Sequence, residues 1–314
     1  MRPRAPFTAV IGAGQVGATT GQRIIEKGIS DVVLFDVIEG MPQGKALDLS
    51  QASAVEGHDR RIHGTNDYKD IAGAAIVVVT AGLPRKPGMS REDLLSANAR
   101  IILDVCGQIK RFASEAIVII VTNPLDLMTH LAHKTLGFPR PRVIGMAGVL
   151  DTARMRYFLA ERLDAVPRDV EAVVLGGHGD LMVPVSSQSR HKGKDVKDLI
   201  GADDLARIEQ RTRDGGAEIV QLLKTGSAFY APASSAAQMA KAILKSENRV
   251  LPVCTHLAGE YGIQDLFFGV PAEIGAGGVR RVVELPLAEA EKRSLLLSAQ
   301  KVRQGVEDLG RLGF

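Results

Sequence analysis

Short apolar runs alternate with longer helix-like segments through the first half of the chain. The runs are rich in β-branched residues and cover 7–11, 32–35, 76–80, 117–121 and 143–144. Runs that are apolar throughout are typical of strands covered by helices on both faces. The rhythm therefore predicts a parallel sheet built from right-handed βαβ units.

The pattern changes after about residue 150. A long helix is expected over 151–163, and strands and helices then follow at closer spacing. The expected strands cover 170–175, 182–185, 250–257, 266–274 and 279–284. Two further helices are expected over 205–245, with an interruption at 227–235 that contains Pro232, and over 286–309. We expect an α/β fold, with a doubly wound parallel sheet in residues 1–148 followed by an α+β domain in residues 149–314.

Length and charge narrow the classes of function. The chain has 314 residues, of which 45% are hydrophobic, so it can build the cores of two ordinary domains. Its 39 basic and 36 acidic residues leave a formal charge of +3. So small an excess argues against a nucleic-acid partner, although a local basic pocket for a small anion is compatible with it.

The cysteines and the apolar stretches exclude further classes. Cys106 and Cys254 lie far apart among apolar neighbours, which predicts core packing rather than redox or zinc chemistry. No apolar stretch approaches the roughly 18–20 residues of a membrane helix, so no membrane association is expected. The N-terminal region has no cleavable signal pattern, and we expect a cytoplasmic protein.

A glycine-rich segment follows the first predicted strand, with the sequence Gly12-Ala13-Gly14-Gln15-Val16-Gly17. It opens a helix that runs to about Lys27, which is the context that a dinucleotide-binding fingerprint requires. The first glycine allows a tight turn, the second lets the backbone approach a pyrophosphate, and the third brings helix and strand together. Free backbone N–H groups at the helix start would then face the phosphates. These features predict a Rossmann domain.

An acidic residue supports this interpretation. The second strand ends in Asp36, about twenty residues after the glycines, where a carboxylate can bind both hydroxyls of the adenosine ribose. The same carboxylate would repel the 2′-phosphate of NADP, so NAD is the expected cofactor. The alternative is a glycine turn in an α/β protein that binds no nucleotide.

A histidine stands in a second glycine-rich bend, Gly176-Gly177-His178-Gly179-Asp180, after an apolar strand. This setting lets the ring face a cleft. The other six histidines lack it and are expected at the surface or in packing. His130 and His133 have helical spacing, but no glutamate or third ligand accompanies them, so no metal site is expected.

Taken in order, these motifs resemble those of the lactate/malate dehydrogenase family over essentially the whole chain. The matching elements are the glycine loop, Asp36, the segment 81–91, Asn98, and the segments 121–124, 150–154 and 177–180. The resemblance implies an enzyme that transfers a hydride between NAD and a 2-hydroxy acid. It makes residues 149–314 the catalytic domain.

The resemblance also implies the proton-transfer pair. Oxidation of a hydroxyl needs a base that is neutral near pH 7, and His178 suits that role. Asp151 is then the carboxylate that orients the imidazole and stabilises the imidazolium. Aspartate is also a good N-cap, so capping of the helix through residue 163 is the alternative role of Asp151.

Three polar side chains, in addition to Arg85, are expected at the substrate by resemblance. Arg154, three residues after Asp151 on one helix face, would grip the C1 carboxylate through two hydrogen bonds. Arg91 would stabilise charge at the C2 oxygen, and Asn123 would donate a hydrogen bond to the substrate. The cofactor is expected to be lined by Val121, Thr122 and Asn123, with Asn98.

Arg85 decides the expected substrate. Within the family an arginine at this place pairs with a second carboxylate, and over a methyl group it would be left unpaired. L-Malate and oxaloacetate are therefore expected, with lactate or another 2-hydroxy acid as the alternative. A non-catalytic NAD-binding protein is a further alternative, against which the complete set of site residues argues. The family forms oligomers, so a homo-oligomer is expected, a tetramer in preference to a dimer.

Overall fold

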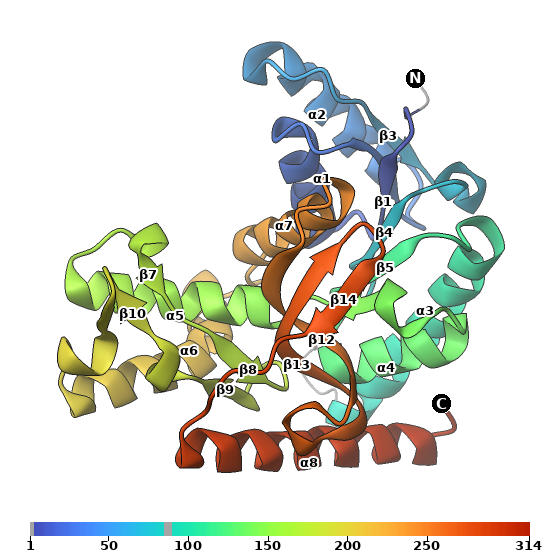
Figure 1. Ribbon diagram of the computed structural model, residues 1–314. Helices are drawn as coiled ribbons and strands as arrows, with labels where there is room; N and C mark the ends of the chain where they lie inside the picture. Colours follow the sequence, from blue (N-terminus) through green and yellow to red (C-terminus); the bar gives the residue numbers. More distant parts are fainter. Residues whose placement is uncertain (1–2, 85–89) are drawn as a thin grey trace.

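A nine-stranded sheet runs through the computed structural model, which describes residues 3–84 and 90–314 (Figure 1). The strand order is β14-β13-β12-β6-β5-β4-β1-β2-β3. The strands of this sheet are β1 Phe7–Ile11, β2 Asp31–Phe35, β3 Ile62–Thr65, β4 Ile76–Val79, β5 Ile117–Ile120, β6 Val143–Gly145, β12 Arg249–Ala258, β13 Gln264–Gly275 and β14 Gly278–Val282. The helices are α1 Gln15–Glu26, α2 Met41–Glu56, α3 Arg91–Phe112, α4 Leu125–Leu136, α5 Gly148–Leu163, α6 Ala202–Leu223, α7 Tyr230–Leu244 and α8 Glu289–Arg311.

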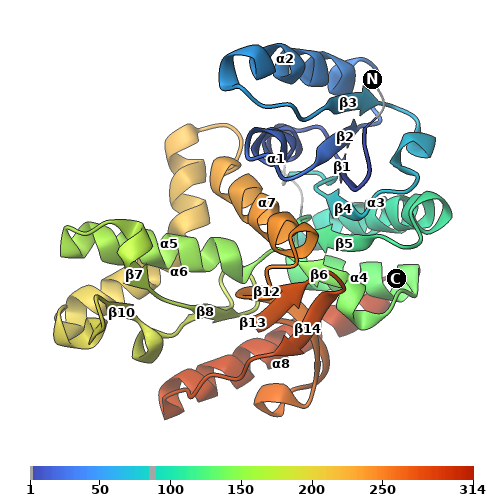
Figure 2. The same cartoon turned by 45° about the horizontal axis from the view of Figure 1, so that its top comes forward.

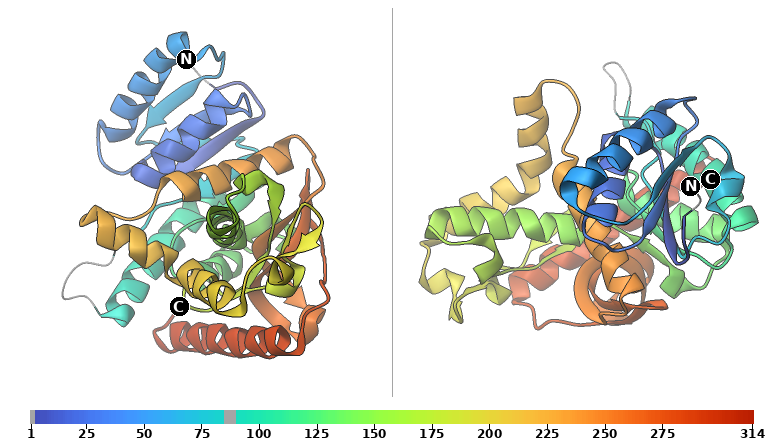
Figure 3. Two further views of the ribbon diagram at one scale, coloured as in Figure 1. Left: turned by 90° about the vertical axis from the view of Figure 1, so that its left-hand side faces the viewer. Right: turned by 90° about the horizontal axis from the view of Figure 1, so that it is seen from above.

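The first six strands are parallel and form the doubly wound sheet that the sequence predicts. Their apolar runs divide between two cores because successive side chains point to opposite faces. Val77 and Val79 of β4, for example, join the core under α3 and α4, whereas Ile76 and Val78 join the core under α1 and α7. Figures 2 and 3 show α7 lying beside α1 on that second face. The prediction of strands covered on both faces is confirmed.

The second half of the chain extends the same sheet. β12 pairs antiparallel with β6 through Cys254 and Gly145, and β13 and β14 follow as antiparallel neighbours. The two halves thus share one sheet, and the expected division at residue 148 falls at the first residue of α5. Two small sheets complete this half; their strands are β7 Val170–Glu171, β8 Val174–Gly176, β9 Met182–Pro184, β10 Arg190–His191 and β11 Lys194–Asp195.

Several expected boundaries need correction. The run 170–175 is two short strands in different sheets rather than one strand. The strand β3 has the sequence Ile-His-Gly-Thr, too polar to be detected as an apolar run. The helical stretch breaks at 224–229, earlier than expected, and Pro232 lies in the first turn of α7, where its missing N–H costs nothing.

A further core lies between β8, β13 and α8, the long helix at the bottom of Figure 1. Leu295, Ala299 and Val302 of α8 face it, and its opposite side is formed by Phe268 and Val270 of β13. This core supports the loop after β8, which carries the candidate base. The two cysteines are buried in the core under α3 and α4, as expected for core packing.

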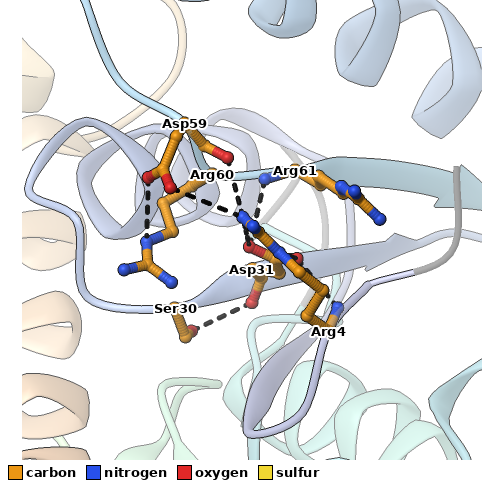
Figure 4. Close-up of polar contacts among 6 residues, drawn as sticks. All are labelled: Arg4, Ser30, Asp31, Asp59, Arg60 and Arg61. Atoms are coloured by element: carbon orange, nitrogen blue, oxygen red, sulfur yellow. Dashed lines mark hydrogen bonds and ion pairs between the residues drawn. The ribbon is translucent and has the colours of Figure 1, made fainter.

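At the amino end of β2 a buried carboxylate anchors the N-terminal segment (Figure 4). Asp31 accepts hydrogen bonds from the Arg4 backbone N at 2.8 Å, from Arg4 Nε at 3.2 Å and from the Arg61 backbone N at 3.2 Å. Burial raises the pKa of Asp31, but these hydrogen bonds outweigh it, so that the pKa is lowered overall. Asp31 is therefore ionised and ties the N-terminal segment and the Arg61 backbone to the amino end of β2.

Candidate active site

The glycine loop joins β1 to α1 at the centre of the parallel sheet. Gly12 has φ +101°, and a Cβ there would lie 2.7 Å from the backbone N of Ala81. A Cβ on Gly17 would lie 1.7 Å from the Gly12 carbonyl oxygen, whereas one on Gly14 would meet no atom within 4 Å. The loop thus requires glycine at position 12 for the turn and at position 17 for close packing. At Gly14 the described residues leave open space. Gly14 is the N-cap of α1, and none of the described side chains caps this helix start, so its first N–H groups can meet an anion.

Two charged side chains hold the loop from opposite sides. Asp36, directly after β2, accepts from the Ala13 backbone N at 2.6 Å and from the Ile38 backbone N at 3.0 Å. Lys45 of α2 donates to the Ala13 carbonyl oxygen at 2.7 Å. The Ala13 peptide is therefore fixed at both its polar atoms. Sequence reasoning missed Lys45, since a lysine on a helix gives no signal of a contact 32 residues away.

A cavity of about 420 Å³ opens beside this loop, at the carboxyl ends of β1, β2 and β4. Its walls include Gly12, Gly14 and Asp36, and apolar side chains such as Ile38 and Met41 complete them. Ligands of doubly wound sheets bind at this edge, where the strand order reverses. A largely apolar pocket with a carboxylate at the end of β2 and open backbone N–H groups fits the adenosine end of a dinucleotide.

The loops after β4 and β5 are tied together next to this cavity. Thr122 Oγ1 donates to the Ala81 carbonyl oxygen at 2.7 Å, and Val121 is buried beside it. Asn98 accepts from the Leu83 backbone N at 2.7 Å and donates to the Asn123 carbonyl oxygen at 2.8 Å. The buried Asn98 side chain thus supports both loops through the backbone. Its contact with a cofactor stays a prediction.

The candidate base and its carboxylate partner meet as the sequence predicts. His178 lies in the loop after β8, and its Nδ1 is 2.8 Å from Asp151 Oδ2. Asp151 is 2% exposed and projects from the first turn of α5, which begins at Gly148 after the N-cap Ala147. The alternative that Asp151 is the N-cap is therefore wrong. The carboxylate at Nδ1 leaves Nε2 of the ring for a reacting group.

The electrostatic setting favours a protonated imidazole. Burial lowers the pKa of His178, but the charge and hydrogen bond of Asp151, together with the charge of Asp126, raise it by more. The net shift is upward from the ordinary value of a histidine. The raised pKa lets the His178 ring hold a proton that it can donate to a group bound at Nε2.

Arg154 lies on the other side of Asp151. Its Nη1 is 3.3 Å from Asp151 Oδ1, and its Nε is buried without a hydrogen-bond partner within residues 3–84 and 90–314. A Cβ on Gly215 of α6 would lie 3.1 Å from Arg154 Cδ, so this helix packs closely against the arginine stem. A largely buried guanidinium whose Nε has no partner among the described residues is a natural site for a carboxylate.

Two of the expected arginines lie wholly or partly outside the residues that the structure describes. Arg91 is the first residue of α3, after the N-cap Ser90, which forms a capping box with Asp93. The structure describes the Arg91 backbone only, and Arg85 lies outside the described residues. The roles of both arginines stay predictions.

Two further side chains hold the His178 loop, and sequence reasoning missed both. Asp126, in the first turn of α4, accepts from the His178 backbone N at 2.8 Å. Ser298 of α8 accepts from the Gly177 backbone N at 3.0 Å and donates to the Leu181 carbonyl oxygen at 2.7 Å. An acid three residues after Asn123 is a weak signal that could have identified Asp126. Ser298 gives no signal.

Metal-ligand clusters and membrane-spanning helices are both absent from the part of the chain that the structure describes. There, no three or more His, Cys, Asp or Glu side chains are grouped so as to hold a metal ion. Nor does any helix in those ranges combine the length and apolarity needed to cross a membrane.

Known proteins resemble both halves of the chain. The family models for the lactate/malate dehydrogenase NAD binding domain and alpha/beta C-terminal domain match residues 8–145 and 148–310. A malate dehydrogenase of Trichormus variabilis is 52% identical over 304 residues, which make up 97% of this chain and 94% of that protein. The crystal structure of Cryptosporidium parvum malate dehydrogenase has a TM-score of 0.95 and 43% identity, covering 99% of this chain and 100% of that one. A Cryptosporidium parvum lactate dehydrogenase complexed with lactic acid and nicotinamide adenine dinucleotide has a TM-score of 0.94 and 39% identity, covering 99% of each chain.

Proposed function

The chain belongs to the lactate/malate dehydrogenase family, and on this premise we propose that it is an NAD-dependent dehydrogenase that interconverts L-malate and oxaloacetate. The observation that carries the proposal is the buried cluster of His178, Asp151 and Arg154, a proton carrier beside a carboxylate-binding guanidinium. Its malate dehydrogenase relative is 52% identical, whereas the lactate dehydrogenase structure is 39% identical.

The residues of the first half fit NAD. The glycine loop and the start of α1 would hold the pyrophosphate, and Asp36 would bind the adenosine ribose. When bound, NAD supplies the carbon that takes up the hydride from malate or returns it to oxaloacetate. The loop carrying Val121, Thr122 and Asn123 would border the same ligand at the end of β5.

His178 is the proposed proton carrier. In malate oxidation Nε2 takes the hydroxyl proton, and in oxaloacetate reduction the imidazolium gives that proton to the C2 oxygen. Asp151 holds the ring at Nδ1 and stabilises the imidazolium without taking up the proton itself. The raised pKa of His178 fits the reduction direction, which needs the protonated ring.

Four other side chains are proposed at the substrate. Arg154 has a buried Nε without a partner among the described residues and would bind the C1 carboxylate. Asn123 would donate a hydrogen bond, and Arg91 would stabilise the C2 oxygen as charge develops there. Arg85 would pair with the second carboxylate, which distinguishes oxaloacetate from pyruvate.

A pair of assays tests the proposal. NADH oxidation should be fast with oxaloacetate and slower by orders of magnitude with pyruvate, because pyruvate lacks the second carboxylate. Faster turnover of pyruvate would assign lactate as the substrate instead. Turnover of neither substrate, with NADH bound, would indicate a non-catalytic protein.

We also propose a homo-oligomer, a tetramer in preference to a dimer, located in the cytoplasm. Exposed apolar side chains on two helices support self-association: Leu47 and Val55 of α2 are 61% and 87% exposed, and Leu222 of α6 is 73% exposed. Sedimentation at micromolar concentration tests the assembly, and a monomer there would contradict it. Fractionation of the source cells tests the location.

A further inference from the structure

A second buried carboxylate lies beneath the candidate base. Asp126 is 6% exposed, and its Oδ2 accepts the His178 backbone N–H at 2.8 Å. Its Oδ1 is buried and has no nitrogen or oxygen partner within residues 3–84 and 90–314. The thiol of Cys254 on β12 lies close to the Asp126 carboxylate. Burial raises the pKa of Asp126, whereas the backbone N–H and the positive charge of His178 lower it, so a protonated His178 ring favours the ionised form of Asp126.

The position of Asp126 joins the two halves of the site. It lies three residues after Asn123, at the start of α4, whereas His178 belongs to the second half of the chain. Its hydrogen bond therefore sets the distance between the proposed substrate donor and the proposed proton carrier. Figure 1 shows α4 next to β13, with β8 reaching the same region from the other side.

We propose that Asp126 is a positioning residue, which fixes the His178 loop against the start of α4 and whose negative charge helps to hold the proton on the imidazole. Two carboxylates would then act on one histidine. Asp151 acts at the ring itself, and Asp126 acts on the backbone from below. The inference rests on the proposed function, since it concerns the proton carrier of that reaction.

Charged side chains face His178 from several elements. Asp151 and Arg154 face it from α5, and Asp126 faces it from α4. The two carboxylates raise its pKa, whereas burial and Arg154 lower it. Asp180 and, on α8, Lys301 line the cavity that also borders His178. Besides Asp151, Asp126 is thus a carboxylate that raises the pKa of His178.

Substitutions separate the hydrogen bond of Asp126 from its charge. Asp126→Asn keeps an oxygen acceptor of the same size and removes the charge, while Asp126→Leu removes both. Ser298→Ala is the matched control, because Ser298 is a neutral acceptor for the adjacent backbone N–H in the same loop. Each variant is first titrated with NADH, which shows that the protein is folded and that its cofactor half is intact.

The main readout is the pH dependence of kcat/KM for oxaloacetate at saturating NADH. Reduction needs protonated His178, so the rate is highest below the pKa of His178 and falls as the pH rises through it. Asp126→Asn should move this fall to lower pH by about one unit, with a small change on the acidic plateau. Ser298→Ala should lower the plateau severalfold and leave the position of the fall unchanged. Asp126→Leu should lower kcat/KM by about 10²-fold or more at every pH.

Each outcome decides one part of the proposal. An Asp126→Asn profile that falls at the wild-type pH would overturn the role of the charge. If kcat/KM of Asp126→Leu is within threefold of the wild-type value, the positioning role is overturned. If Asp126→Leu does not bind NADH, Asp126→Asn takes its place as the test, because it keeps the hydrogen-bond acceptor. A severe loss of kcat/KM on the acidic plateau of Asp126→Asn would then contradict positioning through that hydrogen bond. If the wild type itself does not turn over oxaloacetate, the proposed function fails. NMR titration of the His178 ring, assigned with His178→Asn, then tests the effect of Asp126 without any turnover.

Discussion

The cofactor half and the reacting half of this site are built from different materials. The cofactor half consists mainly of backbone: a glycine loop, a helix start and one strand-end carboxylate within a single βαβ unit. The reacting half consists of charged side chains that are largely buried and neutralise one another: Asp151 and Arg154 come from α5, and His178 comes from the loop after β8. The first depends on conformation, and the second depends on electrostatic pairing.

This difference determines how each half responds to substitution. A site made of backbone tolerates a change in one side chain and loses affinity or selectivity by modest factors. In the reacting half, every charge relies on its neighbour, so removal of one leaves another buried and uncompensated. Large effects on turnover should therefore occur where a charged side chain meets the substrate or another buried charge, and the cofactor half should show changes in binding.

The largest effect is expected for His178→Asn. Without a proton carrier, kcat for oxaloacetate reduction should fall by about 10³–10⁵-fold. The Kd for NADH, measured by fluorescence titration, should change less than about threefold, because His178 is not part of the glycine-loop cavity. A near-normal kcat would exclude His178 as proton carrier, and a lost NADH affinity would show that the two halves are not separable.

A somewhat smaller effect is expected for Arg85→Gln. Loss of a charge-assisted contact with the second carboxylate should lower kcat/KM for oxaloacetate by about 10²–10⁴-fold, and kcat/KM for pyruvate should rise. Lys86→Gln removes the same charge one residue later and should leave the ratio of the two substrates unchanged. If Arg85→Gln lowers both substrates equally, Arg85 does not determine specificity.

The same contrast explains what the sequence could predict. The glycine loop, Asp36 and the parallel strands follow from local spacing, and the structure has them as expected. The pairing of His178 with Asp151 was accessible only through the family motifs, because the two residues are 27 positions apart. Asp126 and Ser298 were missed, since an acceptor for a distant backbone N–H has no sequence pattern.

The shared sheet was also beyond prediction. Nothing in the apolar runs of β12 to β14 indicates that they join β6 rather than form a sheet of their own. The close fit of Gly145 against Cys254, where a Cβ would lie 2.8 Å from the cysteine Cβ, depends on that pairing. Such registers follow from tertiary packing and not from local pattern.

Within the cofactor half, Asp36→Ser should have a moderate effect. Removal of the carboxylate should narrow the preference for NADH over NADPH, measured as the ratio of kcat/KM values, by about 10–10²-fold, because repulsion of the 2′-phosphate is lost. The control is Asp104→Ser, an exposed carboxylate that lines the same cavity. A preference that survives Asp36→Ser, or one that Asp104→Ser narrows equally, would contradict the ribose assignment.

The smallest effect on catalysis is expected at the opposite end of β2, where Asp31 holds the N-terminal segment (Figure 4). Asp31 lies about 17 Å along the strand from Asp36, so Asp31→Asn should leave kcat/KM unchanged. It should instead lower the free energy of unfolding at pH 7 by about 1–2 kcal/mol, because Asp31 accepts charge-assisted hydrogen bonds from Arg4. Asp59→Asn is the control. The Asp59 carboxylate is 77% exposed and lies 3.8 Å from Arg4 Nη2, too far for a hydrogen bond, so its removal should hardly change the free energy of unfolding.

The pH dependence gives the sign of this last effect. The pKa of Asp31 is lowered in the folded protein, so its ionisation stabilises the fold above the unfolded-state pKa of about 3.9. As the pH falls through the lowered folded-state value, Asp31 becomes protonated and that stabilisation is lost. The gap between wild type and Asp31→Asn, measured by urea unfolding, should therefore be constant above about pH 5 and shrink below about pH 4. A gap that does not change with pH would mean that Asp31 acts by shape alone, and a fall in kcat/KM would mean that the strand transmits strain from one end to the other.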